Sequence, residues 1–125
     1  MIHRTTPLAF LLCAAAALSL PGMAQADPTP ALLPAQQFKL HCAVAFAQVA
    51  AAQARGDARA MAYPPLAQRG REYFVRASAG ATNGTGLTQD RLKALLEAEA
   101  TAMSRDGTLY DSMPLCMKSL EASGL

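Results

Sequence analysis

Apolar side chains recur in steps of three and four residues along four stretches of this chain, and that spacing constrains the fold more than any other feature. Residues three and four apart lie on one face of an α-helix, so each stretch presents one apolar face. The residues after position 26 contain no Ile and only three Val, although β-strands favour such β-branched residues. The sequence therefore predicts an all-α bundle of four helices, or of three helices plus a short one.

Each expected helix has its own apolar stripe. We expect the helices to cover approximately residues 35–55, 65–78, 88–105 and 113–122. Gly70 lies inside the second helix, where glycine costs about 1 kcal/mol relative to alanine, and we attribute it to close packing against another helix. The four stripes are, in chain order, Phe38, Cys42, Ala45, Val49 and Ala52; Leu66, Gly70, Tyr73 and Ala77; Leu92, Leu95, Leu96, Ala102 and Met103; and Met113, Cys116, Met117 and Leu120.

Residues that favour helix ends separate these stretches. Gly56 can adopt the positive φ of a C-terminal cap, and Asp57 can cap one or two further turns before Tyr63. Residues 79–87 contain three glycines and predict a loop, after which Thr88 is a good N-cap for the third helix. Residues 108–112 are expected to form a connection, and Pro114 suits the first turn of the last helix.

The first 26 residues are typical of a secretory signal peptide. Arg4 precedes an apolar run of 14 residues, and Ala24-Gln25-Ala26 supplies small residues for cleavage after Ala26. As a helix the run would span about 21 Å, which is short of a hydrocarbon core of about 30 Å. We therefore expect a signal peptide over 1–26, an extended proline-rich leader over 27–34 and a helical domain over 35–125, which is periplasmic or secreted and has no membrane span after cleavage.

Two cysteines remain after that cleavage, Cys42 in the first expected helix and Cys116 in the last. An oxidising compartment favours a disulfide between them, and closing so long a loop stabilises a chain by about 4 kcal/mol. A redox-active pair is the alternative, but such pairs usually have the spacing Cys-x-x-Cys, which this pair lacks. The sequence thus predicts a structural disulfide that joins the first and last helices.

Arginines concentrate in the second expected helix. Arg69, Arg71 and Arg76, together with Tyr73, form a candidate face for an anionic partner, because guanidinium groups pair well with carboxylates and phosphates. The alternative is a solvated helix face, since Glu72 stands at pairing distance from both Arg69 and Arg76. A second pairing of this kind is expected between Lys93 and Glu97.

A copper site is a further hypothesis. His41 is the only histidine after the expected cleavage point, and Met113 and Met117 flank Cys116. Thioether and imidazole ligands suit copper, whereas methionines at helical spacing more often fill a core. No other metal and no cofactor is expected.

The sequence contains no recognisable catalytic set. It lacks Gly-x-Ser-x-Gly and a glycine-rich phosphate loop, and its one remaining histidine adjoins a cysteine that we expect to be oxidised. A net charge of +2 does not favour a nucleic-acid partner. We therefore expect no catalytic residues and an exported, non-enzymatic binding or interaction protein, whose partner is a protein, an envelope component or a small apolar ligand. The alternatives are a periplasmic acid-stress or holdase-type chaperone and a copper-handling protein.

The whole pattern resembles small all-helical proteins that Gram-negative bacteria export and that carry a single cysteine pair. The features that carry the resemblance are the signal, Cys42, the segment from Tyr63-Pro64-Pro65-Leu66 to Arg71-Glu72-Tyr73-Phe74, and Cys116. This group implies no assigned activity. In architecture alone the chain is also similar to periplasmic acid-stress chaperones, which are small, helical and disulfide-bonded.

Overall fold

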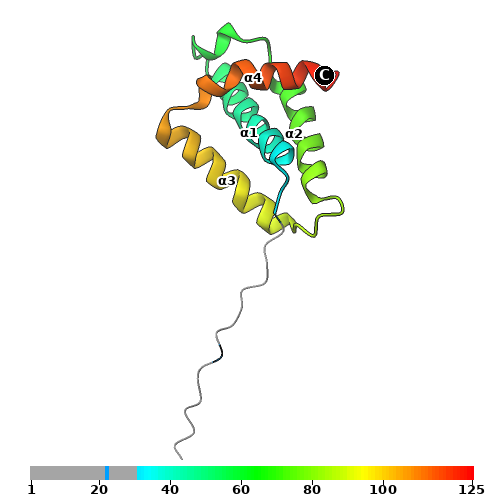
Figure 1. The fold of residues 1–125 in the computed structure, drawn as a ribbon. Coiled ribbons are helices and arrows are strands. Elements are labelled where there is room, and N and C mark those ends of the chain that lie inside the picture. Colours follow the sequence, from blue (N-terminus) through cyan, green and yellow to red (C-terminus); the bar gives the residue numbers. More distant parts are fainter. Residues whose placement is uncertain (1–21, 23–30) are drawn as a thin grey trace, which may run out of the picture.

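The computed structural model describes Gly22 and residues 31–125, and this part of the chain contains helices and no strand (Figure 1). The helices are α1 (Pro34–Ala54), the short 3-10 helix η1 (Ala60–Ala62), α2 (Ala67–Thr82), α3 (Gln89–Asp106) and α4 (Leu109–Ala122). The prediction of an all-α, four-helix bundle is therefore confirmed. Apart from Gly22, the predicted signal peptide lies outside the described residues, as does the leader up to Pro30.

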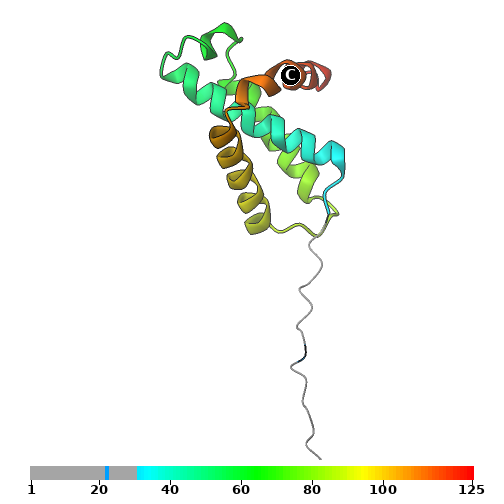
Figure 2. The same cartoon turned by 60° about the vertical axis from the view of Figure 1, so that its left-hand side comes forward.

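Helix α1 lies at the centre and contacts the three other helices (Figures 1 and 2). Its buried side chains surround the helix rather than form a single stripe, as expected for a helix covered on several sides. Phe38 was predicted to be buried, but 40% of it is exposed. It lies in the second turn of α1, before Leu40, where the buried stretch begins. The buried residues of α1 are Leu40, Cys42, Ala43, Val44, Ala45, Phe46, Val49 and Ala52.

Helices α1 and α2 approach each other most closely at Gly70. A Cβ atom placed on Gly70 would lie 3.0 Å from the Cβ of Phe46, so the backbones can meet only because Gly70 has no side chain. One turn along α2, Tyr73 is buried and its ring lies edge-on to Phe46, with centroids 5.1 Å apart. The close packing expected at Gly70 is confirmed.

Helix α2 ends at Thr82, four residues later than predicted. The expected loop contained Gly80, but a helical Gly80 allows Ala81 to be fully buried, and the carbonyl of Gly80 accepts a hydrogen bond of 2.8 Å from Gln36 of α1. These contacts offset the cost of about 1 kcal/mol for a glycine inside a helix. The connection to α3 contains Gly84 and Gly86, both with positive φ, and Thr88 caps α3 as expected.

The link between α1 and α2 is held by Gln53 of α1. Its side-chain amide group lies 3.0–3.1 Å from the carbonyl oxygens of Ala60, Tyr63 and Pro64, and its Oε1 accepts a hydrogen bond from the backbone of Leu66. One glutamine thereby binds four backbone groups of the connection. Asp57 caps the start of η1, as predicted, by accepting from the amides of Arg59 and Ala60.

Helix α4 crosses the end of the bundle and begins at Leu109, one turn before the predicted start (Figure 1). Pro114 is therefore inside the helix, where its missing N–H costs one bond to the carbonyl four residues earlier. The earlier start packs Leu109 and Tyr110 against the core. Cys116 is bonded to Cys42, with Cα atoms 5.1 Å apart, so the predicted disulfide between the first and last helices is present.

Candidate functional site

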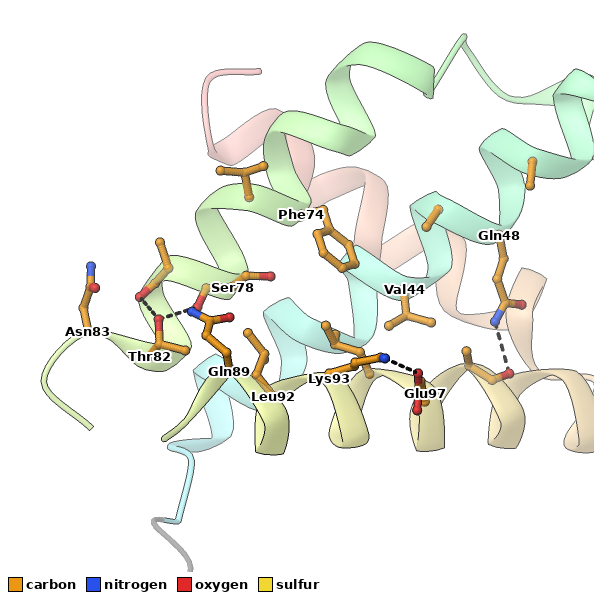
Figure 3. A pocket seen from close by; sticks show the side chains of 16 residues that line it. Val44, Gln48, Phe74, Ser78, Thr82, Asn83, Gln89, Leu92, Lys93 and Glu97 are labelled. Carbon is orange, nitrogen blue, oxygen red and sulfur yellow. Dashed lines mark hydrogen bonds and ion pairs between the residues drawn. The ribbon is translucent and has the colours of Figure 1, made fainter. Parts of the chain in front are cut away.

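A groove of about 900 Å³ opens between α1, α2 and α3 (Figure 3). Helices α2 and α3 lie on either side of α1 and diverge from the loop that connects them (Figure 1). Helix α1 therefore forms the floor, and the other two helices form the walls. The lining residues are Val44, Ala47, Gln48 and Ala51 of α1; Phe74, Val75, Ser78, Ala79 and Thr82 of α2, followed by Asn83; and Gln89, Leu92, Lys93, Leu96, Glu97 and Ala100 of α3.

The surface of the groove is mainly apolar, because most of the residues that line it are alanines or larger apolar residues. Ala47 and Ala51 on the floor are exposed, and their small side chains leave the space open. Phe74 and Leu96 project from opposite walls and are half-buried. Val75, at the edge, is 57% exposed. The groove thus presents apolar surface to solvent.

A few polar groups lie among these apolar residues. Gln48 donates a hydrogen bond of 3.1 Å to the carbonyl of Ala100 and ties the floor to α3. Lys93 and Glu97 form the expected ion pair at 3.8 Å on the rim, so their charges largely cancel. The Ser78 hydroxyl oxygen is buried and has no hydrogen-bond partner within the described part of the chain. It is the one buried side-chain polar atom there that lacks a partner.

Three polar side chains from different helices meet on the other side of α3. His41 of α1 lies with Nδ1 2.5 Å from Oε1 of Glu99 on α3, and with Nε2 2.7 Å from Oγ of Ser112 on α4. All three residues are partly buried. A second cavity, of about 460 Å³, is lined by His41 and Glu99 and by leucines of α1 and α3.

Two of the arginines predicted to form an anionic-partner face, Arg69 and Arg76, bind the C-terminal residues. Arg69 donates to the carbonyl of Leu125, and Arg76 donates to the carbonyl of Ser123 and to the Glu72 carboxylate. Tyr73 is buried, with its hydroxyl 2.6 Å from Oγ of Ser119, and so it does not belong to the exposed surface. Arg71 is exposed beside them. Whether these arginines meet an anionic partner stays a prediction.

The suggested copper ligands occupy different surroundings. Met113 is fully buried, Met117 is half-buried, and both ring nitrogens of His41 lie at hydrogen-bond distance from other side chains. Within residues 31–125 no group of three or more His, Cys, Asp or Glu side chains is placed to hold a metal ion. Copper binding through the methionines therefore stays a prediction.

Sequence reasoning did not identify the groove. Its floor residues Ala47 and Ala51 belong to an alanine-rich helix, and its wall residue Leu96 belongs to a stripe that was predicted to be buried. One feature of the sequence does indicate an uncovered apolar surface on α3. Leu95 and Leu96 are adjacent and point in different directions, so a single neighbouring helix cannot cover both. In the structure Leu95 is 39% exposed.

Comparisons of the chain with protein-family models, curated proteins and solved structures found no match. None of the described helices is long and apolar enough to cross a membrane.

Proposed function

We propose that the chain is an exported binding protein whose groove holds a small, mainly apolar molecule with one hydrogen-bonding group. The observation that carries this proposal is the open apolar groove of about 900 Å³ between α1, α2 and α3. Binding sites for small molecules typically have volumes of about 300–1,000 Å³ and are lined by apolar side chains with a few polar groups.

The size of the groove favours a small molecule over a partner helix. A helix with its side chains is about 10–12 Å wide and rises about 5.4 Å per turn, so each turn fills roughly 400–600 Å³. The groove would hold only about two turns. An elongated apolar molecule fits this volume better than a helix of ordinary length, and it could lie along the floor between Phe74 and Leu96.

Ser78 supports the presence of a polar group on the ligand. Its hydroxyl is buried in the wall and makes no hydrogen bond to any of the residues that the structure describes. An unpaired buried hydroxyl is costly, and turning it toward a ligand would break no existing bond. The paired charges of Lys93 and Glu97 add no net charge to the rim, which favours an uncharged ligand.

Binding of the neutral apolar dye N-phenyl-1-naphthylamine tests this proposal. We expect saturable fluorescence enhancement at neutral pH, competed by 1-decanol. Ala51→Phe fills the floor at an exposed position and should weaken dye binding at least tenfold. Ala54→Phe, three residues along α1 and outside the groove lining, is the matched control and should bind like the wild type.

Two outcomes would count against the proposal. Equal dye binding by the Ala51→Phe and Ala54→Phe variants would place the dye elsewhere on the surface. Dye binding that occurs only after acidification would instead favour the acid-stress chaperone, since such a protein exposes its apolar surface when it loses tertiary packing at low pH.

A further inference from the structure

The side chains of Ser112, His41 and Glu99 form a chain of hydrogen bonds across three helices. The hydroxyl oxygen of Ser112 lies 2.7 Å from Nε2 of His41, and the opposite ring nitrogen lies 2.5 Å from the Glu99 carboxylate. We propose that Ser112 is a nucleophile, His41 its general base and Glu99 the residue that positions His41, in a site that hydrolyses carboxylic esters with an apolar acyl group. None of these three side chains lines the groove, and the activity departs from the sequence-based expectation of a non-enzymatic protein.

The hydrogen-bond partners of His41 fix where its proton lies. An ionised carboxylate can only accept hydrogen bonds, so Nδ1 carries the proton of the neutral ring and donates a hydrogen bond to Glu99. In the neutral ring Nε2 is then an acceptor, and it faces the Ser112 hydroxyl. This tautomer and orientation are what a histidine needs to remove a proton from serine.

Ser112 also has a second position for its proton. Its Oγ lies 3.3 Å from the carbonyl oxygen of Thr108, one turn earlier in α4. The contact with His41 is shorter, so the hydroxyl donates preferentially to the ring nitrogen. When His41 is charged, Nε2–H can donate to Oγ while the hydroxyl donates to Thr108, and each proton state keeps its bonds satisfied.

The disulfide holds the nucleophile and the base together. Cys42 is the residue after His41, and Cys116 lies one helical turn after Ser112 on α4. The bond between them therefore fixes α1 and α4 next to the contact between His41 and Ser112. Glu99 approaches from α3, so three helices converge on the site. Rigid placement of the reacting groups is a general requirement for this chemistry.

The adjoining cavity indicates the class of substrate. It has a volume of about 460 Å³ and is lined by Leu32, Leu40 and Leu95, besides His41 and Glu99. Such a cavity suits a short or medium-length apolar acyl chain. The first-turn amides of an α-helix have no carbonyl within their helix to bond, so those of Leu109 and Tyr110 are the backbone groups to which this proposal assigns the developing oxyanion.

The reaction requires only the ester and water. Ser112 Oγ forms a bond to the ester carbonyl carbon while its proton passes to Nε2 of His41. The bond from that carbon to the alcohol oxygen then breaks, and the alcohol leaves with the proton from His41. Water attacks the resulting acyl-serine and gives its proton to His41, which returns it to Ser112 as the carboxylic acid departs.

A serine-reactive fluorophosphonate tests the proposal on the wild-type, disulfide-bonded chain, followed by peptide mass spectrometry. We expect one adduct, on Ser112, and hydrolysis of p-nitrophenyl butyrate that the adduct abolishes. Ser112→Ala should lose both, whereas Ser104→Ala, which removes an exposed serine of α3, should lose neither.

The roles of His41 and Glu99 are tested separately. His41→Gln should slow labelling at least a hundredfold. Glu99→Gln should leave the thermal midpoint and KM close to those of the wild type while kcat falls at least tenfold. The reason is that the glutamine amide allows His41 to adopt the other tautomer. A fluorophosphonate that leaves Ser112 unlabelled, or that labels Ser112 equally fast in His41→Gln, would overturn the proposal and leave the three side chains as a structural tie between helices.

Discussion

Gly70 shows how one missing side chain sets the distance between α1 and α2. The Cβ of Phe46 lies 3.0 Å from where a Cβ on Gly70 would be, and this atom belongs to the buried central helix and cannot rotate away. Replacement by alanine gains about 1 kcal/mol of helix propensity but forces the two backbones apart. Overpacking of this kind typically costs about 1–3 kcal/mol.

We therefore expect Gly70→Ala to lower the free energy of unfolding, measured by urea denaturation. Gly80→Ala is the matched control in the same helix. A Cβ on Gly80 would meet no atom within 4 Å, so this variant should be more stable than the wild type by up to about 1 kcal/mol. Stabilisation by both variants would show that Phe46 and Gly70 are not tightly packed.

Single residues were also where sequence reasoning succeeded best. The cap at Thr88, the pairing of Glu72 with Arg76 and the packing role of Gly70 depend on neighbours a few residues away or on one missing side chain, and each is present. The contacts of His41 could not be foreseen in this way. Glu99 and Ser112 lie 58 and 71 residues from it, and only the arrangement of three helices brings them together.

At the scale of elements, apolar side chains spaced three and four residues apart predicted the helices. This spacing did not predict which helix lies at the centre. An alanine-rich helix can be read as amphipathic because alanine is tolerated both inside and outside. The predicted stripe of α1 was correct from Cys42 to Ala52, yet the five consecutive residues from Cys42 to Phe46 are all buried, which is more than one full turn. The start of α4 was missed because proline usually marks a first turn, whereas packing of Leu109 and Tyr110 extends the helix ahead of Pro114.

The connection that contains η1 docks on the start of α4 through stacked side chains. Tyr63 stacks on Tyr110 with centroids 6.1 Å apart, and the guanidinium of Arg59 lies 4.2 Å from the Tyr110 ring centroid. Burial raises the pKa of Tyr110 above its ordinary value of 10.0; Asp57 raises it further, while Arg59 lowers it. The folded chain therefore holds the phenolic proton more tightly than the unfolded chain.

A raised folded-state pKa gives stability that is complete below the ordinary pKa and is lost as the pH rises through the folded value. We expect the wild type to lose more free energy of unfolding than Tyr110→Phe between about pH 8 and pH 11, since phenylalanine has no proton to release. Chemical denaturation of both proteins across this range checks the difference. Parallel pH profiles would contradict it.

At the scale of the whole molecule, the core buries little apolar area for its number of residues, and we expect its stability to depend on the disulfide. Alanine buries little apolar area, so its contribution to the hydrophobic stabilisation is small. The disulfide between Cys42 and Cys116 compensates because it restricts a long loop of the unfolded chain. The alanines of the core are Ala43, Ala45, Ala52, Ala60, Ala77 and Ala81.

Removal of the disulfide should therefore be costly. We expect the double variant Cys42→Ala, Cys116→Ala to lose about 4 kcal/mol of unfolding free energy, out of a typical total of about 5–15 kcal/mol. Guanidinium denaturation of the oxidised wild type, the reduced wild type and the variant measures this loss. Equal midpoints for the oxidised and reduced proteins would show that the core is sufficient without the bond.

The groove is a property of the whole molecule, since no single helix contains it. It exists because α2 and α3 both pack on α1 but diverge from each other (Figure 1). The spacing of apolar residues along a sequence predicts helices but not the directions in which they run. The sequence could predict the elements around the groove and the disulfide that joins α1 to α4, but not the space left between them.

The most direct test of the proposed function is methyl NMR of the oxidised chain during titration with 1-decanol. We expect saturable shifts at the methyl groups of Val44, Val75, Leu92 and Leu96, which line the groove, while the exposed Leu33 and Leu115 stay unchanged. The absence of any saturable shift, or shifts confined to Leu33 and Leu115, would contradict the assignment of this groove as a binding site.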